Sequence, residues 1–162
     1  MPLMEDLYAK ERAGTVDLDF YVYNAVNVNF NTTALGVQSQ SQIQIEADSD
    51  FVVRYINFAP WVAGANPFAG GSNATPAPFL IQIQDTGSGR NWSNNPVPVP
   101  AYCGGSLTVG GALPAILPEP RLVVGSAIVN INLTCMLAAN FPRVDISLVG
   151  LKVFYFKRTQ SR

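Results

Sequence analysis

Histidine is absent from this 162-residue sequence, and charged residues make up only 13% of it. The first absence removes the most common general base and the most common metal ligand from any active site. The second leaves the chain well below the charge of an average soluble domain, which is about 25%. Because the formal net charge is −1 and no basic cluster exceeds Lys157-Arg158, we expect no nucleic-acid partner, which would need a basic surface.

Long apolar runs and a cysteine framework are missing as well. No apolar run approaches the ~20 residues of a membrane span, so no membrane partner is expected. Charges between Met1 and Arg12 stand where the apolar centre of a signal peptide would lie, and we expect no signal peptide. Cys103 and Cys135 lie in no metal-binding spacing. They are predicted to be free, buried thiols of a protein made in a reducing cytoplasm.

Amide side chains take the place of the missing charges, with thirteen asparagines and seven glutamines. A surface poor in charge is typical of the centre of a protein interface, where charged residues are depleted. On a free monomer the same surface would lower solubility. The composition therefore favours a chain that functions inside an assembly.

Apolar and polar residues alternate with a period of two over most of the chain, which predicts strands. The expected strands are residues 15–30, with a break at 24–25, then 41–47, 51–58, 79–84, 107–109, 121–124, 126–135 and 143–157. In the last strand the apolar parity changes across Val149-Gly150, and a glycine at such a change predicts a β-bulge. Together the strands predict an all-β fold, an antiparallel β-sandwich for which a jelly roll is the favoured topology.

The domain organisation is expected to be simple. Residues 1–14 are predicted as an N-terminal arm or short helix, residues 15–158 as the β-sandwich domain and residues 159–162 as a C-terminal tail. Since so short a helix is unstable alone, we expect it to dock on another subunit. The interface candidates in this segment are Leu3, Met4, Leu7 and Tyr8.

Two segments rich in glycine and proline, residues 59–78 and 85–120, are predicted as long loops. Loops of this length are usually functional, and proline reduces the entropy that a loop loses on binding. The prolines of residues 96–100 predict that the chain there forms an edge strand or a surface strap. The interface candidates in the loops are Trp61, Phe68, Arg90 and Trp92. The alternative, that their aromatic rings fold back on the chain's own core, stays open.

No pattern of a catalytic, cofactor or metal site occurs. Gly87-Ser88-Gly89 lacks the spacing of a nucleophile motif and a base, and the glycine pairs at 104–105 and 110–111 do not join a strand to a helix. Asp48 and Asp50 flank a turn, which favours solvated carboxylates over a calcium site. We therefore predict that the protein is not an enzyme and has no catalytic, cofactor-binding or metal-binding residues.

Four stretches, FLIQIQDTGSGRNWSNNPVPVP, LPEPRLV, SAIVNINLTC and RVDISLVGLKVF, resemble small virion proteins of tailed bacteriophages. The resemblance is to the jelly-roll decoration or cement proteins of capsids and covers roughly residues 40–156. It implies a non-enzymatic protein, made in the host cytoplasm, that oligomerises as a dimer or trimer on the outside of the capsid. It also implies that the protein bridges copies of the major capsid protein. It supplies no catalytic residues, and residues 1–40 fall outside it.

A second hypothesis is a receptor- or glycan-binding β-sandwich module of a phage tail or fibre. Glycan-binding surfaces use exposed aromatic rings beside acids and amides, and Trp61 and Trp92 could form one. The two hypotheses differ in what covers the loops. A cement protein would have its loops and termini buried by protein neighbours, whereas a glycan-binding module would present an open aromatic surface.

Overall fold

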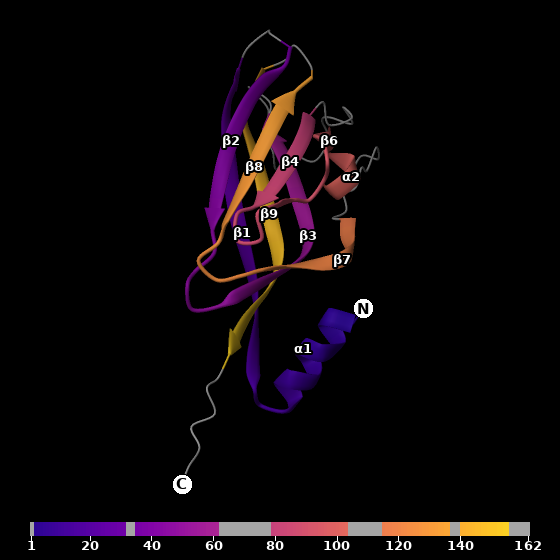
Figure 1. Ribbon diagram of the computed structural model, residues 1–162. Coiled ribbons are helices and arrows are strands. Elements are labelled where there is room, and N and C mark those ends of the chain that lie inside the picture. Colours follow the sequence, from indigo (N-terminus) through magenta and orange to yellow (C-terminus); the bar gives the residue numbers. More distant parts are fainter. Residues whose placement is uncertain (1, 32–34, 62–78, 104–114, 137–139, 156–162) are drawn as a thin grey trace.

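Two antiparallel β-sheets pack face to face in the computed structural model, which describes residues 2–31, 35–61, 79–103, 115–136 and 140–155 (Figure 1). Sheet A has the strand order β1-β9-β3-β7, and sheet B has the order β2-β8-β4-β5, with β6 also paired to β4. The strands are β1 (Val16–Asn31), β2 (Val37–Gln44), β3 (Asp50–Trp61), β4 (Phe79–Asp85), β5 (Arg90–Asn91), β6 (Val97–Pro98), β7 (Ala115–Val123), β8 (Ile128–Cys135) and β9 (Asn140–Tyr155).

The chain changes sheet at nearly every step. Strands β1, β3, β7 and β9 belong to sheet A, and β2, β4 and β8 belong to sheet B. Only β4, β5 and β6 follow one another within a sheet. This wrapping around two sheets is a jelly-roll topology. The all-β sandwich predicted from the alternating sequence is therefore confirmed.

The main core lies between the sheets and is formed by every second residue of their strands. In β4, for example, buried and half-buried residues alternate along the whole strand. Each large apolar side chain buried in this way stabilises the fold by about 1.5–3 kcal/mol. The largest fully buried side chains of this core are Phe51, Phe79, Ile45, Ile56, Ile81, Ile83, Ile131, Leu133, Ile146 and Leu148.

A second apolar cluster lies on the outer face of sheet A, beneath helix α1 (Pro2–Arg12). Met4 and Leu7 of α1 are 6% and 3% exposed and pack with Val52, Leu151 and other residues of β1, β3 and β9. The helix ends where the chain turns left-handed at residue 14, with φ +66°. The chain's own sheet therefore holds this helix, and its docking on another subunit stays a prediction.

The parity change in β9 comes from this second cluster and not from a bulge in β9. Pairing between β1 and β9 runs without interruption from Val16 and Tyr155 to Val28 and Arg143. The even-numbered apolar residues of β9 before Gly150 face the core between the sheets, and the odd-numbered ones after it face α1. The predicted bulge in β9 is therefore wrong.

The irregularity lies in the neighbouring strand, directly opposite Gly150. The pairing of β3 with β9 and with β7 shifts between Val53 and Tyr55. A Cβ atom at Gly150 would stand 1.9 Å from the carbonyl oxygen of Val52. The glycine is needed because the backbone of β3 approaches β9 at this point.

Several boundaries also differ from the sequence prediction. β1 runs through residues 24–25 without a break, and β2 begins at Val37 inside an expected loop. β7 covers residues 115–123, where a loop was expected as far as residue 120. Its Pro118 and Pro120 are tolerated because β7 is an edge strand, which among the described strands pairs only with β3.

The predicted strap is confirmed, since Val97 and Pro98 pair with the edge of β4 opposite Ile81 and Leu80. A short helix, α2 (Pro100–Cys103), follows it and was not predicted. The strand expected at residues 107–109 and the tail at 159–162 lie outside the described residues.

Candidate functional site

Amide side chains cover the outer face of sheet B. In β2 the residues at even positions are exposed and all of them are glutamine, while the odd positions turn toward the interior. The outward positions of β4 and β8 add further amides and a threonine, all half-buried. We call this surface the amide face, and it consists of Gln38, Gln40, Gln42, Gln44, Gln82, Gln84, Asn130, Asn132 and Thr134.

The backbone register aligns these amides in rows that cross the three strands. In one row Gln40 lies opposite Asn132, which lies opposite Gln82. In the next row, formed by residues 42, 130 and 84, Asn130 Nδ2 donates a hydrogen bond to Gln84 Oε1 at 3.3 Å. Because neighbouring strands lie about 4.7–4.9 Å apart, the face is an ordered array of donors and acceptors.

One acceptor in the middle of this array has no hydrogen-bond partner among the described residues. Asn130 Oδ1 is buried, although its own Nδ2 is bonded to Gln84. A buried acceptor without a partner costs about 1–3 kcal/mol.

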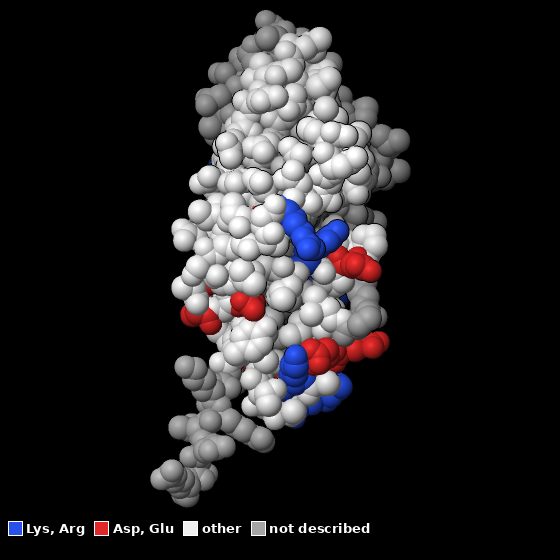
Figure 2. Space-filling model, in the orientation of Figure 1, with Lys and Arg blue, Asp and Glu red and all other residues white. Residues whose placement is uncertain are grey.

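Charge is absent from this part of the surface. In the orientation of Figure 1, β2, β8 and β4 face the reader, and Figure 2 shows mostly uncharged residues over this part of the molecule. The charged side chains in this view gather toward the end of the sandwich nearest α1. Another protein can therefore cover the amide face without the large cost of removing water from a charge.

The interface candidates predicted on α1 fall into two groups. Met4 and Leu7 are buried in their own chain, and Leu3 is partly buried against the same cluster. Tyr8 is 37% exposed and keeps apolar surface available. That these residues contact another chain stays a prediction. Of the four, Tyr8 exposes the most surface to such a partner.

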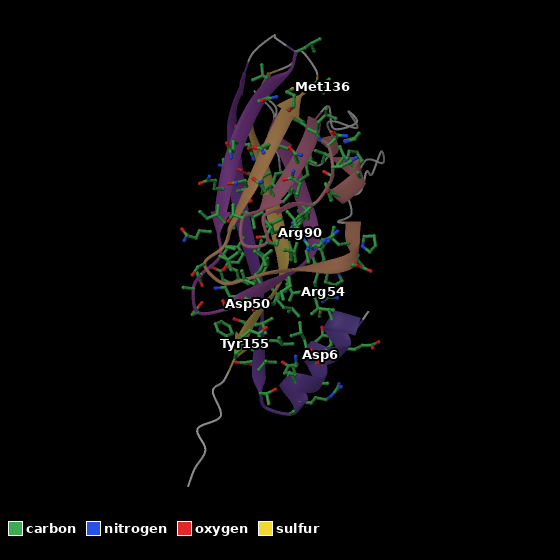
Figure 3. All side chains as sticks on the ribbon, viewed as in Figure 1. Asp6, Asp50, Arg54, Arg90, Met136 and Tyr155 are labelled. Atoms are coloured by element: carbon green, nitrogen blue, oxygen red, sulfur yellow. The ribbon has the colours of Figure 1, made fainter. Side chains whose placement is uncertain are left out.

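The interface candidates in the loops also differ in burial. Trp92 is half-buried and packs against the core between the sheets, and its backbone N–H donates to the carbonyl of Ile83 at 2.9 Å. For Trp92, the alternative that the aromatic ring folds back on the chain's own core is therefore correct. Arg90 is exposed on β5, at the border of the amide face (Figure 3). Trp61 ends β3 but its side chain lies outside the described residues, as does Phe68.

A buried lysine, Lys152 of β9, forms an ion pair near two tyrosines. Lys152 is 5% exposed, forms an ion pair with the carboxylate of Glu46, and lies 3.8 Å from the ring centre of Tyr21 and 5.6 Å from that of Tyr23. Burial alone would lower the pKa of Lys152, but the Glu46 carboxylate and the tyrosines outweigh it and the pKa is raised. Burial also raises the pKa of Tyr23. Because the ammonium group is enclosed by these partners, we interpret the cluster as a structural ion pair.

The acidic residues considered for calcium are engaged in local structure. Asp50 accepts a hydrogen bond from the backbone N–H of Gly125 at 2.8 Å. Burial, with the nearby Asp50 carboxylate, raises the pKa of Tyr155, which lies beside Asp50 (Figure 3). Among the described residues, no group of three or more His, Cys, Asp and Glu is placed to hold a metal ion.

Within the described part of the chain, no helix is both long and apolar enough to span a membrane. Cys135 is a buried thiol, as expected, and the side chain of Cys103 lies outside the described residues.

No protein-family model matches the chain, and no curated protein sequence is similar to it. The likeness to capsid decoration proteins therefore rests on the four stretches quoted above.

Sequence reasoning found two strands of the amide face and missed the start of the third. The outward amides of β4 and β8 follow from the period of two. The first half of β2 falls in a predicted loop because residues 37–40, VQSQ, contain a single apolar residue. The alternation of glutamine from Gln38 to Gln44 was the pattern that could have revealed the strand.

Proposed function

We propose that this chain is a structural virion protein, a capsid decoration or cement protein that binds the outside of the shell and bridges major capsid subunits. The observation that carries the proposal is the amide face, which spans three strands and has no charged residue among its members. The resemblance of residues 40–156 to decoration proteins supplies the identity of the partner.

The physical argument concerns the cost of covering a surface. A protein surface that always faces water normally carries many charges of both signs, which keep it soluble. Interface centres lose charged residues because a charge must give up its water on burial. Amides lose less on burial, and their directional hydrogen bonds favour one docking geometry.

The proposal is tested by adding charge to the amide face. Gln40→Lys with Asn132→Lys places two positive charges side by side in one row of the face. Gln40 is exposed and Asn132 is half-buried on the outer face of sheet B, so the fold should survive. Shells of the virus that encodes the chain, prepared without this protein, are mixed with the purified variants and sedimented.

The matched control is Ala13→Lys, which adds charge at an exposed turn after α1. We expect the wild type and the control to sediment with the shells and the double variant to stay in solution, with equal circular dichroism spectra for all three. The proposal fails if the wild-type protein stays in solution, or if the folded double variant sediments as well as the control.

Glycan binding is less well supported as a function of the same face. Sugar rings bind to exposed aromatic surfaces, and the described residues of the amide face include no aromatic side chain. Trp92, a candidate for such a surface, packs on its own core. A glycan array incubated with the isolated protein distinguishes this alternative, since a cement protein should give no signal on it.

A further inference from the structure

The two sides of the sandwich differ in how their edge strands are protected against pairing. On one side the edges are β7 of sheet A and the short strands β5 and β6 of sheet B; β6 and β7 are at the right of Figure 1. Proline and charged side chains on an edge hinder the addition of another strand. These edges carry Arg90, Pro98, Pro118, Glu119, Pro120 and Arg121.

The opposite side is formed by β1 and β2, and beyond Asp17 and Asp19 at the start of β1 these edges carry no charged residue or proline. Residues 20–31 of β1, FYVYNAVNVNFN, include no charged residue, proline or glycine, and neither does β2, VQSQSQIQ. Among the described strands, β1 pairs with β9 alone. Toward its end β1 lies beside β2, where Asn27 Nδ2 donates a hydrogen bond to Ser41 Oγ at 2.9 Å. The edge that stays open runs from Phe20 to about Val26, which is roughly 20 Å at about 3.3 Å per residue. Such an edge invites aggregation unless a specific partner covers it.

Strand β1 also exposes large apolar side chains along this edge. Phe20, Val22 and Val26 are 60%, 44% and 40% exposed, and all lie on the outer face of sheet A. Asn24 stands between the two valines and is exposed as well. The outward residues of β2 are glutamines, so the apolar surface that pairing could cover belongs to β1.

We propose that β1 pairs antiparallel with β1 of a second copy, which joins two copies of sheet A into one continuous sheet around a two-fold axis at Asn24. Val22 of one copy then lies opposite Val26 of the other, and the two Asn24 residues face each other. A second copy fits this edge because its own strand is equally free of charge and brings the same apolar residues. Antiparallel pairs of this kind keep matching side chains on one face of the sheet.

The proposed pairing of β1 does not depend on the proposed function. It does determine how the two amide faces of the dimer are oriented. An axis that relates two neighbouring strands in this way is perpendicular to the sheet. The amide faces of the two copies therefore point in the same direction. If the amide face binds a shell, a dimer can bind with both faces at once and gains avidity.

The register of the proposed β1–β1 pairing is tested with two double variants of the full chain. They differ only in the sign of the charge at residue 22. Val22→Lys with Val26→Lys places like charges opposite each other at both sides of the axis, whereas Val22→Glu with Val26→Lys places opposite charges there. We expect the wild type to sediment as a dimer at micromolar concentration. The lysine pair should weaken the dimer at least about tenfold relative to the glutamate–lysine pair.

The matched control is Leu122→Lys, because Leu122 is 41% exposed on the opposite edge of sheet A. This variant should remain a dimer. A monomeric or trimeric wild type would overturn the proposal, and so would equal dimerisation of the two double variants.

A crosslink gives a second measurement that does not rely on charge. Residues directly opposite each other in an antiparallel pair have Cα atoms about 4.5–5.5 Å apart, which a disulfide can span. Asn24→Cys should therefore form a covalent dimer on mild oxidation. Thr86→Cys, exposed in a turn away from β1, should not. Failure of the Asn24→Cys protein to crosslink faster than the Thr86→Cys protein would also overturn the proposal.

Discussion

Replacing Gly150 with alanine should be one of the most damaging single changes in this protein. The added Cβ would stand 1.9 Å from the carbonyl oxygen of Val52 and 2.8 Å from its carbonyl carbon. Both are backbone atoms, so no side-chain rotation can relieve the contact. Strand β9 must move away from β3, and β9 is an inner strand of sheet A with buried residues on both faces.

The expected cost follows from what that movement breaks. One or two backbone hydrogen bonds between β3 and β9 contribute about 0.5–1.5 kcal/mol each. Displaced packing in the two apolar clusters adds about 1–3 kcal/mol. We expect a total loss of about 1.5–6 kcal/mol in the free energy of unfolding, and for a chain of this size each kcal/mol lowers Tm by about 2–4 °C.

The control is Gly89→Ala, measured in the same urea and thermal unfolding experiments. Gly89 has φ +66° but no atom within 4 Å of an added Cβ, so the change should cost only backbone strain, about 1 kcal/mol. If Gly150→Ala destabilises the protein no more than Gly89→Ala does, the close approach of β3 and β9 is not as described.

Three further predictions concern α1, the buried lysine and the buried thiol. Leu7→Ala should destabilise the protein by about 2–3 kcal/mol because Leu7 is 3% exposed on the face of α1 that packs on sheet A. Tyr8→Ala should change stability by no more than about 0.5 kcal/mol. Equal melting temperatures for the two variants would contradict the packing of α1 on sheet A. The pKa values of Lys152 and Tyr23 are raised in the fold above their ordinary values of 10.5 and 10.0. Their contribution to stability is therefore complete below pH 10 and lost as the pH rises through the folded values. Urea unfolding between about pH 8 and pH 12 should show this loss, and Glu46→Gln should reduce it; a flat profile for the wild type would argue against the ion pair. Cys135 is 2% exposed, so alkylation followed by peptide mass analysis should label it far more slowly in the native protein than in urea, and equal labelling rates would place it at the surface.

The alternation of residue types determined much of this protein by itself. A strand presents successive side chains to opposite faces, so the inward apolar residues and the outward Asn130, Asn132, Gln82 and Gln84 follow from the local pattern. The absence of histidine and the scarcity of charge narrow the range of functions through composition alone. The strap at Val97–Pro98 follows from the missing N–H groups of proline.

Contacts between distant segments decided the rest. Nothing local to β9 indicates that Leu151 faces a helix while Leu148 faces the other sheet, because α1 supplies that second apolar surface from the far end of the chain. The partner strands of β7 decide whether Pro118 is tolerated, and the neighbours of β2 decide whether Gln40 joins an array or stands alone. Sequence alternation defines the face on which a side chain lies. Only the pairing of strands far apart in the chain brings those faces together, because hydrogen bonds between strands do not depend on which side chains they carry.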